Sequence, residues 1–145
     1  MLLISCFRLI KNFVRTGDYP VSLIMADCNY LKQTNDTLGH EYGDLLLQRV
    51  ASVIRGSIDS SGIAMRIGGD EFLILCPHCS AERAAWMIAN MKQKLVEKSD
   101  EKLTLSASFG SATIADDSLS FEEAYKLADQ AMYQEKEAFH ASSPR

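Results

Sequence analysis

The hydrophobic and polar positions of the chain form two kinds of segment. Apolar, β-prone runs of strand length are typical of strands buried in a sheet. These runs are residues 21–26, 63–67, 72–75 and 103–114. Apolar residues at helical spacing predict amphipathic helices. These segments are residues 2–14, 41–58, 80–97 and 121–133. A polar stretch between the first strand and the second helix predicts a short helical turn and a loop.

Glycine and serine residues mark several ends and turns. Gly68 and Gly69 predict a tight turn that joins two strands into a hairpin, because glycine accepts the positive φ of such turns. Gly110 predicts a bulge or turn in the last strand. Ser120 opens the last helix as part of a capping box, and Ser80 is expected to be an N-cap without one.

The order of these segments predicts the fold class. Strands interleaved with amphipathic helices favour an α/β (α+β) domain with one central sheet and helices packed on it. The hairpin supplies an antiparallel pair, so we expect a mixed sheet with the βαββαβ core of ferredoxin-like, polymerase-palm and nucleotidyl-cyclase-like domains. A chain of 145 residues is long enough for one such domain, so residues 1–145 are expected to form a single unit.

Composition narrows the class of partner. The chain is 47% hydrophobic and 23% charged, as is ordinary for a soluble globular protein. Its net charge is −4 and it has no basic run, which argues against nucleic acid as a partner. A polyphosphate nucleotide stays open as a ligand, because a metal ion can supply positive charge locally.

The N-terminal segment and the cysteines bear on location. Residues 2–14 are interrupted by basic side chains, so we expect an amphipathic helix packed on the domain, with a membrane-surface helix as the alternative. The four cysteines are interpreted as reduced thiols of a cytoplasmic protein, although a longer parent protein could be anchored to a membrane. Cys76 and Cys79 have redox or zinc spacing, but no second ligand pair accompanies them, and a simple loop after a strand is the alternative.

Two carboxylates are candidates for chemistry. Asp27 ends the first buried strand, where a carboxylate needs a partner such as a metal ion. Asp70 stands at the hairpin turn, and in the predicted topology the two side chains could converge. Together with the backbone carbonyl of Cys28 they would form a hard-oxygen site for Mg²⁺ or Mn²⁺, which is suited to phosphoryl or nucleotidyl transfer. The alternatives are a helix or loop cap for Asp27 and a solvent-exposed hairpin tip for Asp70.

Three segments, taken together, resemble a known family. RIGGDEFLIL, with DCNYLKQTND upstream and TLGHEYGD between them, is similar to the GGDEF family of diguanylate cyclases. The resemblance covers residues 19–136. It implies that each domain binds one GTP and that two domains face each other as a homodimer. Each 3′-oxygen then attacks the other α-phosphate, giving cyclic di-GMP and two pyrophosphates.

The resemblance also implies roles for individual residues. Asp27, Asp70 and the carbonyl of Cys28 would hold the divalent ions, and Glu71 would assist at the 3′-hydroxyl or the second metal. Further residues would bind the nucleotide through its guanine edge, its base pocket or its phosphates. The guanine contacts would be Asn35 and Asp44, the base-pocket residues Leu31 and Leu38, and the phosphate contacts Lys32, Lys136 and the backbone at Gly68 and Gly69.

Several differences from the family pattern limit what the resemblance implies for this chain. The family's opening segment and closing strand are not visible, so we expect a domain that is truncated at both ends and that lacks the regulatory domain which usually precedes it. Asp59-Ser60-Ser61-Gly62 stands where the family carries a product-inhibition motif, so we expect no inhibition through that site. His140 replaces an expected arginine, and Asn29 replaces a commoner aspartate. The alternatives to a cyclase are a weak or inactive module that binds GTP or cyclic di-GMP, and a related palm-fold fragment.

Overall fold

Four strands and the helices between them follow the predicted order. The computed structural model describes residues 16–142, so the helix expected over residues 2–14 lies outside the described part. The elements are η1 (Thr16–Asp18), β1 (Val21–Cys28), α2 (Leu31–Leu38), α3 (His40–Ser57), β2 (Ile63–Arg66), β3 (Glu71–Cys76), α4 (Ala81–Lys98), β4 (Ala107–Ile114) and α5 (Phe121–Ser142).

The strand order is β2-β3-β1-β4, and each neighbouring pair is antiparallel. The α/β fold class with a βαββαβ core is confirmed, but the sheet is antiparallel where a mixed sheet was expected. The reason is that each crossover connection joins two parallel strands that are not neighbours in the sheet. β3 lies between the parallel strands β1 and β2, and β1 lies between the parallel strands β3 and β4, so every neighbouring pair is antiparallel.

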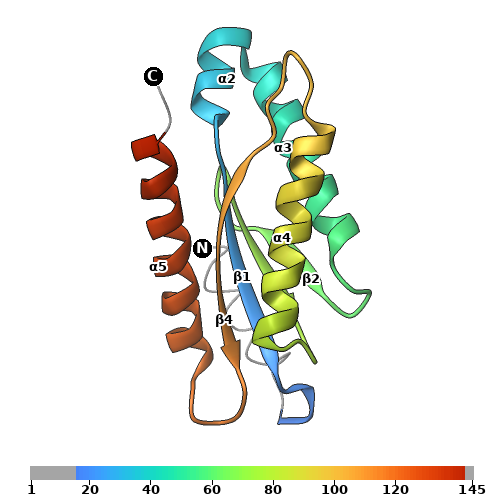
Figure 1. The fold of residues 1–145 in the computed structure, drawn as a ribbon, viewed down its shortest axis with the longest axis vertical. Helices are drawn as coiled ribbons and strands as arrows, with labels where there is room; N and C mark the ends of the chain where they lie inside the picture. Colours follow the sequence, from blue (N-terminus) through green and yellow to red (C-terminus); the bar gives the residue numbers. More distant parts are fainter. Residues whose placement is uncertain (1–15, 143–145) are drawn as a thin grey trace.

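The sheet is covered on both faces (Figure 1). α3 and α4 lie on one side and α5 lies on the other. Along β1, Ile24 and Ala26 pack toward α3 and α4, whereas Leu23 and Met25 pack toward α5. All eight residues of β1 are buried, which accounts for the continuous apolar run that predicted this strand.

Gly110 has a different role from the predicted bulge or turn. β4 pairs with β1 without interruption through eight consecutive residues, so the strand continues through Gly110. A Cβ atom at this position would collide with the backbone of α5 at Ala128 and Met132. Glycine is therefore needed because α5 lies directly on the strand, a close approach that only a residue without a side chain permits.

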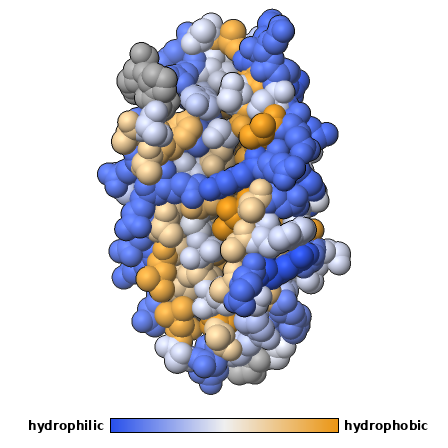
Figure 2. Space-filling view, in the orientation of Figure 1, coloured by the Kyte–Doolittle hydropathy of each residue, from blue (hydrophilic) through white to orange (hydrophobic). Residues whose placement is uncertain are grey.

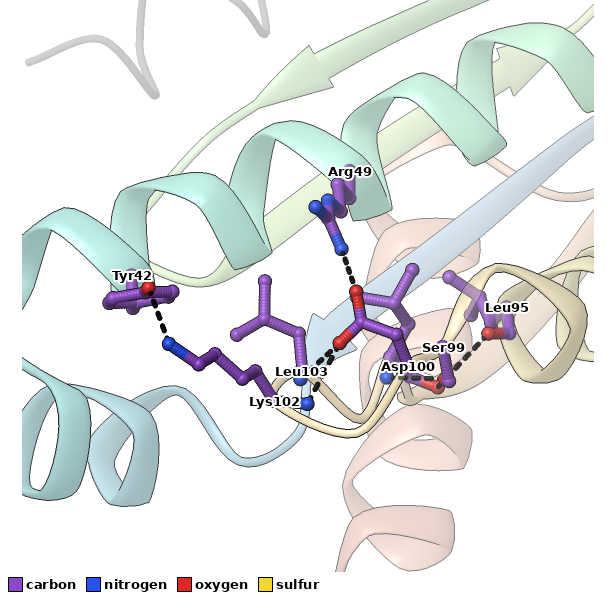
Figure 3. A network of polar contacts seen from close by, with 8 residues as sticks. Tyr42, Arg49, Leu95, Ser99, Asp100, Lys102 and Leu103 are labelled. Atoms are coloured by element: carbon purple, nitrogen blue, oxygen red, sulfur yellow. Dashed lines mark hydrogen bonds and ion pairs between the residues drawn. The ribbon is translucent and has the colours of Figure 1, made fainter.

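The last strand begins later than the sequence predicted. Leu103 and Leu105 were expected in the strand, yet their amides donate to side chains of the preceding loop (Figure 3). The Leu103 amide donates to Asp100 Oδ1 at 2.8 Å and the Leu105 amide to Ser99 Oγ at 2.7 Å. Asp100 also accepts from Arg49 at 2.9 Å, which ties the loop to α3. These bonds replace the ladder hydrogen bonds that a strand would need.

Both predicted helix caps are present. The Ser120 amide donates to Glu123 Oε1, and the Glu123 amide donates to Ser120 Oγ, each at 3.1 Å, so the capping box is confirmed. Ser80 accepts from the Arg83 amide at 3.1 Å, which confirms the N-cap of α4.

An apolar strip runs between α4 and α5 over β4, and polar residues cross it (Figure 2). An ion pair between Lys92 Nζ and Glu135 Oε1 at 2.9 Å joins the two helices. The Glu135 carboxylate also accepts from the backbone amide of Phe109 at 3.0 Å, on β4. No helix within residues 16–142 has the length and apolar character needed to cross a membrane.

Candidate functional site

The end of β1 and the hairpin turn meet at one place. Asp27 is the penultimate residue of β1 and is paired in register with Glu71, the first residue of β3. The Cys28 amide donates to the backbone oxygen of Asp70 at 2.8 Å. The sheet therefore brings Asp27, Asp70 and Glu71 together, as the convergence hypothesis required.

Asp27 is a buried carboxylate with a lysine against it. The Nζ atom of Lys136, on α5, lies 2.9 Å from Asp27 Oδ1. Burial raises the pKa of Asp27 from 3.8 to about 6, contact with Lys136 opposes this rise, and the neighbouring Asp70 carboxyl adds to it. Burial also raises the pKa of Glu71, and the charges of Asp129 and Asp70 raise it further. The site thus holds more negative charge than its own lysine offsets.

This donor set fits a divalent cation. Asp27 and Asp70 are oxygen ligands of the kind that Mg²⁺ and Mn²⁺ prefer, and their mutual repulsion would be relieved by a cation. Burial raises the pKa of the Cys28 thiol to about 12, so the thiol stays protonated and only its backbone carbonyl is a candidate ligand. Residues 16–142 contain no cluster of three or more histidine, cysteine, aspartate or glutamate side chains suited to a metal. A bound ion would therefore depend on this carboxylate pair and on backbone or substrate oxygens.

A hollow of about 260 Å³ opens beside Asp70. Five residues predicted for the site line it: Cys28, Leu31, Lys32, Asp70 and Lys136. The segment predicted as a turn and loop is the eight-residue helix α2, and this helix places Leu31 and Lys32 at the rim. The hollow thus gathers two cationic side chains and one carboxylate.

Four other residues line the hollow. Sequence reasoning assigned no role to Tyr30, Gln33 and Phe139, and noted His140 only as standing where the family has an arginine. Phe139 and His140 follow Lys136 by three and four positions, a spacing that puts them on one helix face and was a usable signal. The ring of Tyr30 contacts that of Phe139 edge to face, with centroids 5.2 Å apart. These two rings therefore form an aromatic side of the hollow, where α2 begins and α5 approaches its end.

The residues predicted to bind guanine lie apart from this hollow. Asp44 is exposed and lines a second hollow, of about 430 Å³, together with Arg66 and Phe72. The side chain of Asn35 packs over Gly43, and a Cβ atom at position 43 would collide with that side chain. The two predicted guanine contacts thus lie on α3 (Asp44) and on the part of α2 that packs against α3 (Asn35), whereas Lys136 lies on α5.

Leu38, also predicted for the base pocket, is 37% exposed at the end of α2 and lines neither hollow. The structure therefore gathers Cys28, Asp70, Lys32 and Lys136 around one hollow, together with Leu31 of the predicted base pocket, and leaves Asn35, Asp44 and Leu38 outside it.

Gly68 and Gly69 do not have the positive φ expected of a tight hairpin turn. Within residues 16–142, Gly39 is the glycine with a left-handed φ. The link between β2 and β3 is a wider loop, closed by the Ile67 amide donating to the Glu71 carbonyl at 2.9 Å. A Cβ atom at Gly69 would have no neighbour within 4 Å, so the space outside the turn is open.

Cys76 and Cys79 are buried free thiols at the end of β3 and just before α4. Burial raises the pKa of Cys76 to about 12 and also raises that of Cys79. Such thiols are poor nucleophiles and poor metal ligands. Their packing in the α3–α4 core favours the structural alternative over a redox or zinc site.

Comparison with known proteins matches residues 6–141 to the family described as "Diguanylate cyclase, GGDEF domain". Diguanylate cyclase A of Treponema denticola is 31% identical over 121 residues, which are 81% of this chain and 33% of that protein. Probable diguanylate cyclase DgcJ of Escherichia coli is 34% identical over 128 residues, 88% of this chain and 25% of that protein. The chain thus spans at most about a third of the length of these curated relatives.

A solved microbial GGDEF domain, described for its interaction with bis-(3′,5′)-cyclic di-GMP, superposes with a TM-score of 0.78. It is 30% identical, and the match covers 92% of this chain and 83% of that one. The predicted resemblance and fold class are confirmed by these matches.

Proposed function

Because the chain belongs to the GGDEF family of diguanylate cyclase domains, we propose that it binds GTP and joins two GTP molecules into cyclic di-GMP. Each 3′-oxygen forms a bond to the α-phosphorus of the other GTP, and the bond from that phosphorus to pyrophosphate breaks. Two pyrophosphates and two protons leave. The observation that carries this proposal is the hollow lined by Asp70, Lys32 and Lys136, with Asp27 held against the same Lys136.

Each residue near the turn has a task that its surroundings support. Asp27, Asp70 and the carbonyl of Cys28 would hold Mg²⁺ or Mn²⁺. When bound, such an ion offsets phosphate charge and makes the 3′-hydroxyl more acidic. Glu71 would accept the 3′-hydroxyl proton, and its raised pKa makes it a stronger base than an ordinary carboxylate.

The remaining residues would bind and orient GTP. Lys32 and Lys136 would contact the triphosphate as point charges. Asn35 and Asp44 would read the guanine edge, because a carboxylate accepts from N1–H and the 2-amino group together, a donor pair that adenine lacks. Leu31 and Leu38 would pack beside the base.

The reaction needs two copies of the site. The product has two-fold symmetry, so a C2 pair of identical domains is the natural catalyst. Each domain would present one GTP, and turnover per domain would rise with protein concentration as pairs form. Partner proteins and other domains of a longer chain would set when this pairing occurs.

The test is incubation with GTP and Mg²⁺ at several protein concentrations, with nucleotides separated by chromatography. We expect cyclic di-GMP and a rate per domain that increases with concentration. Asp70→Ala should abolish turnover because it removes a ligand of the ion, while the control Asp116→Ala, in the loop before α5, should not. GTP binding without cyclic di-GMP at any concentration would instead support a nucleotide-binding module.

A further inference from the structure

The guanidinium of Arg66 grips the turn that precedes Asp70. Arg66 is the last residue of β2. Its Nε atom donates to the carbonyls of Gly68 and Gly69, each at 3.1 Å, and its Nη2 atom donates to the Gly69 carbonyl at 2.7 Å. A planar guanidinium with several fixed donors is suited to holding two carbonyl groups at once.

The turn has few other constraints on its shape. Neither glycine is held in the left-handed region, and Gly69 has no neighbour within 4 Å of the position of a side chain. Two successive glycines have the largest backbone freedom of any residue pair. The hydrogen bonds at Ile67 and Cys28 fix the chain before and after the turn. The orientation of the two glycine carbonyl groups is then held by the hydrogen bonds from Arg66.

The orientation of the Gly68 and Gly69 carbonyl groups also fixes the direction of the amide groups in the same peptide units. In a trans peptide the C=O and the N–H point to opposite sides. Since the carbonyls of Gly68 and Gly69 face Arg66, the amides of Gly69 and Asp70 face away from it. Adjacent amides that point the same way form a site suited to an anionic oxygen.

We propose that Arg66 is a positioning residue for the nucleotide site. By holding both glycine carbonyls, it aims the amides of Gly69 and Asp70 at the phosphates and fixes the Asp70 carboxylate beside Asp27. This inference rests on the proposed function for its consequence in catalysis. The grip itself can be measured without any turnover.

The variants separate the effect of the hydrogen bonds from Arg66 to the glycine carbonyls from the effect of its positive charge. Arg66→Ala removes both, and Arg66→Lys keeps the charge but loses the planar pair of donors. Arg55 is the matched control: it lines the same hollow as Arg66 and lies on α3, away from the turn. If the charge in that hollow were what matters, Arg66→Lys would behave as the wild type and Arg55→Ala would resemble Arg66→Ala.

The first measurement is the NMR order parameter of the Gly69 and Asp70 amides in nucleotide-free protein. We expect a value near that of rigid backbone, about 0.85, in the wild type and in Arg55→Ala, and a fall below about 0.6 in Arg66→Ala and Arg66→Lys. Thermal unfolding of each variant checks that the fold is intact. Low order parameters in the wild type, or unchanged ones in both Arg66 variants, would overturn the grip.

The second measurement is the split between kcat and KM for GTP. A misplaced turn should lower kcat by about 10- to 100-fold in both Arg66 variants, with a smaller change in KM. A raised KM with unchanged kcat would mean that Arg66 contacts the nucleotide directly, and would refute the positioning role. If the wild type made no cyclic di-GMP, the proposed function would fail and the order parameters alone would decide on the grip.

Discussion

Burial of Asp27, opposed by its contact with Lys136, makes the stability of the domain depend on pH. The side chains are 22% and 9% exposed, so solvent screens this pair less than a surface ion pair. Asp27 has a pKa of about 6 in the folded chain against 3.8 as its ordinary value. Since the folded pKa is raised, Asp27 contributes most to stability below pH 3.8. That contribution is lost as pH rises toward and through 6.

The size of this effect follows from the two values. The rise from 3.8 to about 6 corresponds to about 3 kcal/mol of stability lost when Asp27 ionises. Lys136 limits this loss, because its ammonium holds the pKa down. In Lys136→Met the pKa of Asp27 should rise further, and the loss of stability should continue above pH 6. If Asp27 then stayed protonated up to pH 8, the added loss at pH 8 would be about 3 kcal/mol.

The assay is urea unfolding of wild type and Lys136→Met, followed by circular dichroism at pH 5 and pH 8 with a chelator present. At pH 5 most Asp27 is already protonated in the folded wild type and methionine keeps most of the packing of the lysine stem, so the loss is mainly that of the Lys136 hydrogen bond, about 1 kcal/mol. At pH 8 the variant should lose about 2–3 kcal/mol more than it does at pH 5. Lys126→Met, an exposed lysine change on the same helix, should shift neither value.

An equal loss at both pH values would refute the reasoning, because it would show that Lys136 acts through packing rather than charge. The variant Asp27→Asn supplies a second check. In that background the carboxylate is gone, so adding Lys136→Met should produce a loss that no longer differs between pH 5 and pH 8.

Three further substitutions test other parts of the account. Asp44→Ala should weaken GTP binding and reduce the preference for GTP over ATP by calorimetry; unchanged affinity and preference would remove Asp44 from the base site. Gly69→Ala should leave the melting temperature unchanged or slightly higher, since φ permits alanine there, yet weaken GTP binding if phosphates approach the turn; unaltered binding would contradict that approach. Gly110→Ala should lower stability by about 1–3 kcal/mol or more in urea unfolding, because its Cβ collides with the backbone of α5 at Ala128, and a neutral result would mean that α5 can move aside at little cost.

Local patterns in the sequence predicted most of the fold. Helical spacing identified α3, α4 and α5, and the pairing of Ser120 with Glu123 located the start of α5 correctly, because these signals depend on neighbours in the chain. The predicted start of β4 was wrong because the side chains of Ser99 and Asp100 accept hydrogen bonds from backbone amides that a strand would use for pairing. The spacing of hydrophobic residues gives no indication of that competition. The antiparallel sheet depends on how two crossovers interleave, which no single segment reveals.

The site divides in the same way. The motifs identified Asp27, Asp70 and Lys136 as members, but the contact of Lys136 with Asp27 joins residues 109 positions apart and needed the packing of α5 on the sheet. Arg66 gave no signal of its own, since an arginine near a turn is usually a solvated charge. Its role became visible only when its donors were found on the glycine carbonyls.

The glycines show why a residue type alone does not reveal its purpose. A glycine is required for a left-handed φ, for crowding inside the fold, or for room outside it. Gly39 meets the first condition with φ 96°, and Gly110 meets the second through α5. Gly69 meets neither, because its φ is not left-handed and nothing lies within 4 Å of the position of a side chain. The open space at Gly69 leaves room for a ligand that approaches the turn from outside, as the proposed nucleotide would if its phosphates lay near Asp70 and its base near Asp44.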